Sequence, residues 1–442
     1  MKLKLILFNL FILFSQLNAQ EGFKMEEIKN KVTIPFQFIN NLIIIPVEVN
    51  GVSLNFLLDT GVEETILFSL DETEEISFAH IEKIKIRGFG NRDPFEGLKS
   101  INNTLNIKGF KDVNHTLYLV LDQEINISSQ VGIPVNGIIG HHFFDKNLVK
   151  IDYSSKKITI YKNTVKQSNK FSKSFSKAPI EIQDGKPYML ANVMFDGNNK
   201  YSSNLLIDIG NSDAIWLFKN KNPLIKMPSI FIEDFLGRGF GGDVFGKRAR
   251  ISKFEVANFT ITNPLVAFPD DSNLEGITLP DDRLGSIGSE IMSRFTIVFD
   301  YKSKFIYLKK NNSFNNPFNY NMSGLEIQHQ GLQWVKESYE ENPAIANNLL
   351  DSSGERVAGN FKYRFELKPI YVISNVRKGS PAGLSGLKRD DIIVSINGNK
   401  CYKYTLQEIN QLIKSQDEKA LEFTIDRNGT IMLFKFQLKT II

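Results

Sequence analysis

The segment Asn55-Phe56-Leu57-Leu58-Asp59-Thr60-Gly61 recurs 149 residues later as Asn204-Leu205-Leu206-Ile207-Asp208-Ile209-Gly210. Two further landmarks repeat 148 residues apart: Gly137-Ile138-Ile139-Gly140 returns as Gly285-Ser286-Ile287-Gly288, and Asp152-Tyr153 returns as Asp300-Tyr301. Three landmarks kept in one register indicate an internal duplication. We therefore predict two copies of one domain, over residues 30–165 and 178–312.

Each copy has the pattern of a β domain. Residues 42–49 and 52–58 are apolar runs joined by Asn50-Gly51, which is a favoured hairpin turn, and the second run ends at Asp59. Residues 188–195 and 201–207 repeat this arrangement ahead of Asp208. Long helical patterns are scarce, so the predicted fold class is mainly β.

Both aspartates stand between an apolar strand and a glycine turn, a position that would bury and restrain their carboxyls. Two carboxyls about 3 Å apart cannot both ionise, so they share a proton and titrate in two separate steps. The ionised carboxyl can then deprotonate a water, while the protonated carboxyl donates to a carbonyl oxygen. Such a pair would hydrolyse a peptide bond with no metal, cofactor or covalent intermediate.

The duplicated motifs resemble the retropepsin-like and pepsin-like aspartic peptidases, including two-lobed exported bacterial members, over residues 35–310. The resemblance implies an acid-protease fold of two homologous β-barrel lobes, with Asp59 and Asp208 as the catalytic pair. It implies that Thr60 reaches across to the backbone of the other lobe. The residues that would support the pair are Thr60, Gly61, Ile209, Gly210, Ser212, Ile139, Gly140, Ile287 and Gly288.

The chain departs from the family pattern at two places. Ile209 stands where the family has Thr or Ser, so one of two cross-lobe hydroxyl contacts would be missing. Val62-Glu63 follow Gly61 where small and hydroxyl residues are usual, so Asp59 would lose a hydrogen bond that Ser212 keeps in the second lobe. Because both carboxyls remain, we expect an aspartic endopeptidase; a non-enzymatic peptide-binding protein on a degenerate peptidase scaffold is the alternative.

The family also closes flaps over its bound peptide. Two glycine-bearing segments are candidates for these flaps, Gly88-Phe89-Gly90 and Gly239-Phe240-Gly241. Glycine would let such loops move and would let their backbone approach a substrate strand. Plain surface turns are the alternative interpretation.

The C-terminal part of the chain has a different pattern. An apolar strand at residues 370–376 precedes Gly379-Ser380-Pro381-Ala382-Gly383-Leu384, and Asn397-Gly398 follows as a turn. This pattern resembles the PDZ family, which implies a PDZ-like α+β domain over residues 323–442, with 328–363 as an insertion. Because PDZ domains add an extended peptide beside their second helix, its expected site comprises Phe365, Glu366, Leu367, Leu406 and Ile409. A brace between domains is the alternative role.

The N-terminus resembles a secretory signal peptide at residues 1–19. Lys2 and Lys4 precede an apolar run over residues 5–14, and Ala19 offers a cleavage site. We therefore expect export to the periplasm or the exterior; an uncleaved membrane anchor is the alternative. A net charge of +4 gives no reason to expect nucleic acid as a partner. The expected partners are a polypeptide substrate and a peptide ligand of the PDZ-like domain.

Other reactive residue types do not form a recognisable site. His141-His142 have no neighbouring carboxylate or cysteine cluster with metal spacing, so a structural role is expected and no metal site is predicted. Cys401 is the only cysteine of the chain, so it cannot form an internal disulfide, and we expect it to fill space on a strand.

Overall fold

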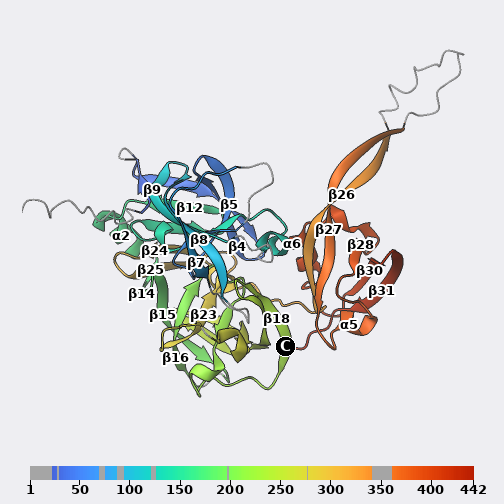
Figure 1. Cartoon of the computed structure of the whole chain (residues 1–442). Coiled ribbons are helices and arrows are strands. Elements are labelled where there is room, and N and C mark those ends of the chain that lie inside the picture. The colour runs from blue at the N-terminus through green and yellow to red at the C-terminus, as the bar shows by residue number, and fades with distance from the viewer. Residues whose placement is uncertain are drawn as a thin grey trace, which may run out of the picture.

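The computed structural model describes residues 22–26, 29–68, 75–86, 94–120, 126–196, 199–275, 277–340 and 361–442. Strands predominate among these residues and form four sheets, so the predicted class, mainly β with an α+β domain at the C-terminus, is confirmed (Figure 1). The expected signal segment and the first candidate flap, Gly88-Phe89-Gly90, lie outside the described residues.

The sheet of lobe 1 brings Asp59 to the end of a strand beside a parallel neighbour. Its strands are β1 (Lys24–Met25), β3 (Gln37–Ile39), β4 (Leu42–Val49), β5 (Val52–Leu58), β6 (Thr65–Leu67), β7 (Ile81–Ile86), β8 (Phe95–Ile107), β9 (Phe110–Leu119) and β10 (Gly137–Ile139). The β4–β5 hairpin turns at Asn50-Gly51, both with positive φ, as predicted. β10 runs parallel to β5 with Ile139 opposite Leu58.

The sheet of lobe 2 repeats this arrangement around Asp208. Its strands are β14 (Glu181–Gln183), β15 (Lys186–Met194), β16 (Tyr201–Asp208), β17 (Ile215–Leu217), β18 (Phe231–Gly239), β19 (Gly242–Arg250), β20 (Lys253–Val256), β21 (Phe259–Thr262), β22 (Leu265–Pro269) and β23 (Arg283–Gly288). β23 runs parallel to β16 with Gly288 opposite Asp208. The duplication in the sequence is thus a duplication of topology around each aspartate.

A third sheet belongs to both lobes. Its strands are β2 (Lys31–Pro35), β11 (Leu148–Asp152), β12 (Lys157–Tyr161), β13 (Ser176–Pro179), β24 (Phe295–Asp300) and β25 (Phe305–Lys310). β11 of the first half pairs antiparallel with β24 of the second half, where Ile151 faces Ile297. Both side chains are fully buried, so the two lobes share a core as well as a sheet.

Short helices connect the strands of the two lobes. They are α1 (Ile127–Val131), η1 (His141–Phe143), α2 (Val165–Ser172), η2 (Lys219–Lys221), η3 (Asp271–Leu274) and α3 (Ser289–Met292). The Thr164 side chain caps α2, the helix that leads from one lobe to the other. Within the described ranges, no helix is long and apolar enough to cross a bilayer.

The C-terminal domain is a small sheet with two helices. It comprises β26 (Leu325–Glu340), β27 (Phe361–Val376), α5 (Pro381–Ser385), β28 (Ile392–Ile396), β29 (Asn399–Lys400), η4 (Cys401–Lys403), α6 (Leu406–Leu412), β30 (Ala420–Arg427) and β31 (Thr430–Gln437). Ser380 caps α5, and Thr405 with Glu408 forms a capping box at α6. Within the expected insertion over residues 328–363, the described residues 328–340 and 361–363 belong to β26 and β27.

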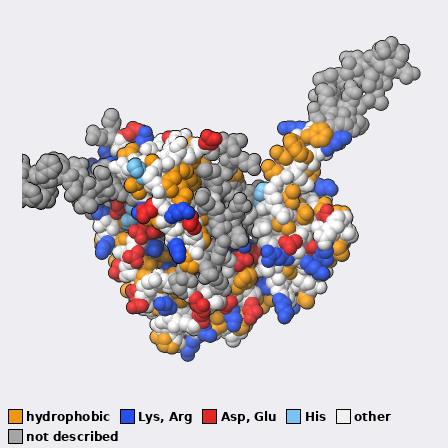
Figure 2. All heavy atoms as spheres, in the orientation of Figure 1, with side chains coloured by type: hydrophobic (Ala, Val, Ile, Leu, Met, Phe, Trp, Pro, Cys, Tyr) orange, Lys and Arg blue, Asp and Glu red, His pale blue; other side chains and the backbone are white. Residues whose placement is uncertain are grey.

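The distal part of β26 and β27 projects from the domain as a two-stranded ribbon (Figure 1). Trp334 lies opposite Leu367, and Leu332 lies opposite Pro369, so these apolar side chains share one face of the ribbon. Trp334 is 70% exposed. Hydrophobic side chains are visible along this ribbon in Figure 2.

Candidate active site

The structure brings the two predicted catalytic aspartates together. Asp59 follows β5, and its backbone N–H donates to the Ile139 carbonyl at 3.0 Å. Asp208 ends β16 in the other lobe. The two carboxyls are close enough for one to donate a hydrogen bond to the other. Residues 149 positions apart therefore form one pair, which we call the dyad.

Backbone N–H groups hold each carboxyl of the dyad. Gly61 donates to Asp59 Oδ1 at 2.6 Å, and Asn211 donates to Asp208 Oδ1 at 3.0 Å. Because an N–H donor stabilises the ionised form, these contacts partly offset the cost of burying the carboxyls. Each aspartate is therefore fixed by its own turn, as the duplicated sequence predicts.

Glycine is required beside the dyad for clearance. A Cβ atom on Gly61 would lie 2.9 Å from Asp208 Cγ, so this glycine faces the carboxyl of the other lobe. Gly210 faces Asp59 even more closely. Neither glycine has the positive φ of a left-handed turn. Both glycines lie in turns, as expected, and they also leave room for the opposite carboxyl.

The two crossing strands lie directly against the aspartate loops. A Cβ atom on Gly140 would stand 2.3 Å from the Val62 carbonyl oxygen, and one on Gly288 would stand 2.1 Å from the Asp213 carbonyl oxygen. Ile139 and Ile287, which precede these glycines, are fully buried. The same close backbone approach in both lobes explains why both crossings end in glycine.

Thr60 joins the two lobes at the dyad, as predicted. Its hydroxyl donates to the Ile207 carbonyl at 2.7 Å and accepts from the Ile209 N–H at 3.1 Å. The side chain is fully buried. One hydroxyl thus fixes the backbone on both sides of Asp208.

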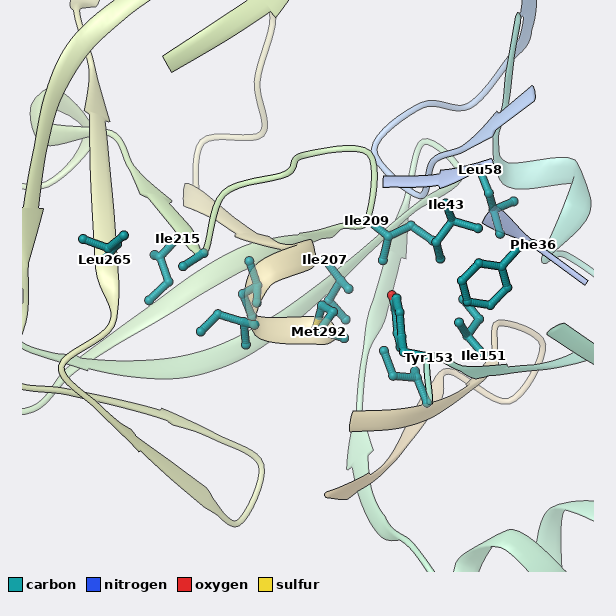
Figure 3. Packing of buried hydrophobic residues seen from close by; sticks show 14 of the residues in the cluster. Phe36, Ile43, Leu58, Ile151, Tyr153, Ile207, Ile209, Ile215, Leu265 and Met292 are labelled. Atoms are coloured by element: carbon teal, nitrogen blue, oxygen red, sulfur yellow. The ribbon is translucent and has the colours of Figure 1, made fainter. Parts of the chain in front are cut away.

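Ile209, the residue opposite Thr60, contributes an apolar contact in place of a hydroxyl. It is fully buried, and Figure 3 shows it beside Ile43 and near Leu58 of lobe 1. Its carbonyl accepts from the Ser289 hydroxyl at 2.8 Å. The missing cross-lobe hydrogen bond is therefore accompanied by packing of the same side chain into the other lobe.

Ser212 has a different contact from the one expected. Within the described ranges no hydrogen bond joins its hydroxyl to Asp208. Its carbonyl instead accepts from the Asn41 side-chain amide at 3.0 Å. Ser212 therefore links its loop to lobe 1, and Asn211 supplies the donor to Asp208.

The two carboxyls occupy unequal electrostatic environments. Burial, and then the charge of Asp208, raises the pKa of Asp59 well above its ordinary value, against the N–H donors of Gly61 and Gly210. Burial also raises the pKa of Asp208, but the positive charge of Arg283 opposes that rise. Arg283 is only 5% exposed. Arg283 therefore favours the negative charge on Asp208, while the pair as a whole shares one proton.

Tyr301, which the sequence marks only as part of the repeat, lies next to the dyad. Its ring stacks on His141 and Phe144, with centroids 5.7 and 5.4 Å away. Burial, and then the charge of Asp59, raises the pKa of the Tyr301 phenol well above its ordinary value. The phenol therefore stays neutral beside Asp59.

A buried arginine supports the loop that follows Asp208. Arg248 on β19 bonds Asp213 Oδ1 at 2.7 Å and Asp234 Oδ2 at 3.0 Å. The Trp216 indole N–H donates to the other Asp213 oxygen at 2.7 Å. No sequence motif indicated this cluster, because its members come from three separate segments.

The second candidate flap is the tip of the β18–β19 hairpin. Gly239 and Gly242 are paired at the end of the hairpin, and Gly241 belongs to its turn. The Phe240 ring contacts Phe68 of lobe 1 with centroids 6.4 Å apart. A hairpin of lobe 2 therefore reaches across to lobe 1.

His141, His142 and Cys401 make contacts inside the fold. His141 Nδ1 lies 2.8 Å from the Gly185 carbonyl oxygen. Burial lowers the pKa of His142 to about 4. Cys401 is buried in η4 and not on a strand, and burial raises the pKa of its thiol to about 12. Among the described residues, no three His, Cys, Asp or Glu side chains form a metal-binding group.

The residues expected to bind peptide in the C-terminal domain lie in two places. Leu406 and Ile409 lie on α6 and are buried. Phe365, Glu366 and Leu367 lie in the ribbon, paired with residues 334–336. The loop that precedes β26 is Ser323-Gly324, at the predicted start of the domain; the alternating apolar residues after Gly324 could have indicated it as the ligand-side loop.

Comparisons with known proteins gave one family model and one solved structure to report. No curated protein matches the sequence. Among solved structures, the chain is similar to an aspartic proteinase from Irpex lacteus, with 12% identity and a TM-score of 0.40, over 65% of this chain and 98% of that one. The family model described as PDZ domain matches residues 372–427. The chain therefore carries a PDZ domain at its C-terminus.

Proposed function

We propose that this protein is an aspartic endopeptidase that hydrolyses peptide bonds with a water activated by Asp59 and Asp208. One observation carries the proposal: two carboxyls from duplicated loops, Asp59 buried and Asp208 half-buried, lie against each other and are held by backbone donors. Such a pair retains one proton over a wide pH range, which is the state that acid–base hydrolysis needs.

The unequal surroundings of the carboxyls set their roles. Asp208, whose charge Arg283 favours, accepts a proton from the attacking water. Protonated Asp59 donates to the carbonyl oxygen, and the hydroxyl bonds to the carbonyl carbon to give a tetrahedral diol. The proton on Asp208 then passes to the amide nitrogen as the carbon–nitrogen bond breaks. One diol hydroxyl returns its proton to Asp59, which restores the starting state.

The substrate would be an extended polypeptide that lies between the lobes. The β18–β19 hairpin would cover it, because Phe240 already reaches Phe68 on the opposite side. We also propose that the protein is exported to the periplasm or the exterior, because residues 1–19 have the pattern of a signal peptide. The hydrolysis itself draws only on side chains of the chain and water.

The decisive experiment is cleavage of an unfolded test protein from about pH 3 to about pH 8. We expect a bell-shaped dependence in the wild type and no cleavage by Asp208→Asn or Asp59→Asn, with circular dichroism unchanged. Cleavage that persists in both variants would refute the dyad mechanism.

Ile209 favours a second function, peptide binding without hydrolysis. A single hydroxyl, that of Thr60, joins the lobes at the dyad, while Ile209 only packs there. Under this alternative the folded wild type would retain a peptide that blocks the cleft and would cleave nothing at any pH. Equilibrium binding measured beside the cleavage assay separates the two functions.

A further inference from the structure

The groove of the PDZ domain is bordered by an edge strand. β26 pairs with β27 on one side only, so its other edge is the position at which a PDZ ligand adds a strand. α6 packs near β26 and forms the second wall. A ligand in this groove would contact Leu406, the first residue of α6.

Lobe 1 packs against this groove. Helix α1 packs against β26, and its C-cap Gly132 faces α6 so closely that a Cβ atom there would stand 2.8 Å from Leu406 Cβ. Leu406 is 2% exposed, and Ile327 on β26 is 6% exposed. Asn410 of α6 also donates to Asn40 of lobe 1 at 3.4 Å.

The loop that could hold a peptide carboxylate is also engaged. The Gly324 N–H donates to Asn321 Oδ1, and the Leu325 N–H donates to Ser323 Oγ, both at 3.0 Å. The next side chain, Glu326, is an acid whose Oε1 accepts from Asn321 at 3.2 Å. Internal partners use these donors, and an acidic side chain follows them, so the loop is unsuited to a second carboxylate.

A second contact connects the PDZ domain to the loop that follows Asp208, which we call the dyad loop. Arg377 of the PDZ domain donates to Asp234 Oδ1 at 3.1 Å, and the other oxygen of Asp234 accepts from Arg248. Arg248 in turn holds Asp213, five residues after Asp208. Arg377, Asp234 and Arg248 are all less than 10% exposed. A cavity of about 610 Å³ separates part of the groove from lobe 1, since β26, α6 and α1 all line it, and Asp234 and Arg248 border the same cavity.

We propose that lobe 1, through α1 and Gly132, is the ligand of the PDZ groove, and that the docked domain positions the dyad loop through Arg377. The role of Arg377 in catalysis rests on the proposed peptidase function, whereas the assignment of lobe 1 as the ligand rests on the packing alone. The PDZ domain thus acts as a clamp, by which we mean that it binds a lobe of its own chain. Arg377 is a positioning residue that acts through Asp234 and Arg248.

The first test loosens the groove with one methyl group. Gly132→Ala places a Cβ against Leu406, whereas Gly51→Ala adds a methyl at a similarly positive φ in lobe 1 with nothing within 4 Å. Hydrogen–deuterium exchange of the full chain should be faster in β26 and α6 for Gly132→Ala than for Gly51→Ala. Equal exchange in the two variants would overturn the assignment of lobe 1 as the ligand.

The second test removes the connection at Arg377. Arg377→Gln should lower kcat by about three- to tenfold with KM unchanged, and should speed exchange over residues 208–217. Arg427→Gln is the matched control, because Arg427 pairs with Asp391 inside the domain. Arg377→Lys, which keeps the charge, should recover most of kcat.

The exchange measurement separates this inference from the peptidase proposal. If the wild type cleaves nothing, faster exchange over residues 208–217 in Arg377→Gln alone still supports the clamp. If Arg377→Gln and Arg427→Gln give the same exchange, or if Arg377→Gln raises kcat, the positioning role is wrong.

Discussion

A Cβ atom on Gly210 would stand 2.1 Å from the carboxyl carbon of Asp59, so the loop of one lobe limits the space of the catalytic group in the other. Gly210→Ala should therefore displace Asp59 and lower kcat by about 100-fold, the cost of a displacement near 1 Å. Gly61→Ala, with its nearest atom at 2.9 Å, should lose less activity. Equal losses measured by steady-state kinetics would contradict this geometric account.

The pKa of Asp59 predicts a pH-dependent effect on stability. Because burial and the charge of Asp208 raise the pKa of Asp59 in the folded chain, the unfolded chain ionises first as the pH rises through 3.8. The free energy of unfolding then falls until the folded pKa is passed. Asp59→Asn removes this loss, so its Tm should exceed that of the wild type at pH 7 by several degrees.

The same difference in Tm should shrink as the pH falls below 3.8, where the carboxyl is protonated in both states. Differential scanning calorimetry at several pH values measures it. A difference that stays constant with pH would mean that the stabilisation arises from something other than ionisation of Asp59.

Thr60 should be a stability residue as well as a support of the dyad. Its hydroxyl takes part in two hydrogen bonds to the backbone of lobe 2, and Thr60→Val removes both while it keeps the shape. We expect a loss of about 1–3 kcal/mol in the free energy of unfolding, because buried backbone groups are left unpaired. Thr60→Ser should keep most of that stability in urea denaturation.

The contact between Phe240 and Phe68 predicts a role for the β18–β19 hairpin in substrate binding. An aromatic contact contributes about 0.5–1.5 kcal/mol, so Phe240→Ala should raise KM by a factor of roughly 3–10. Phe245→Ala is the control, since Phe245 packs on Phe235 within the same hairpin. The flap interpretation fails if both variants have the KM of the wild type.

The sequence predicted the parts of the site that local pattern controls. The spacing of the repeats identified Asp59 and Asp208, and Thr60 makes the cross-lobe contact that the family resemblance implied. Ile209 was identified as a missing hydroxyl, but its packing against lobe 1 depends on tertiary structure. A pattern of residue types does not specify what a buried side chain touches.

The charged residues around the dyad could not be predicted for the same reason. Arg248 meets Asp213 and Asp234 across 35 and 14 residues, and Arg377 meets Asp234 across 143 residues. Isolated charges of this kind are indistinguishable in sequence from those on a solvated face. The expectation for Phe365, Glu366 and Leu367 rested on a position in sequence, and long pairing with β26 puts them on the ribbon.

The sheet shared by the lobes has a consequence for the order of synthesis. β11 and β12 leave the ribosome well before β24, so a nascent first lobe presents an open strand edge until its partner arrives. Antiparallel pairing of that edge with β11 of a second nascent chain would imitate the native contact. A fragment that ends near residue 165 should therefore self-associate. The pairing of β11 with β24 can prevent this association only after translation has passed residue 300.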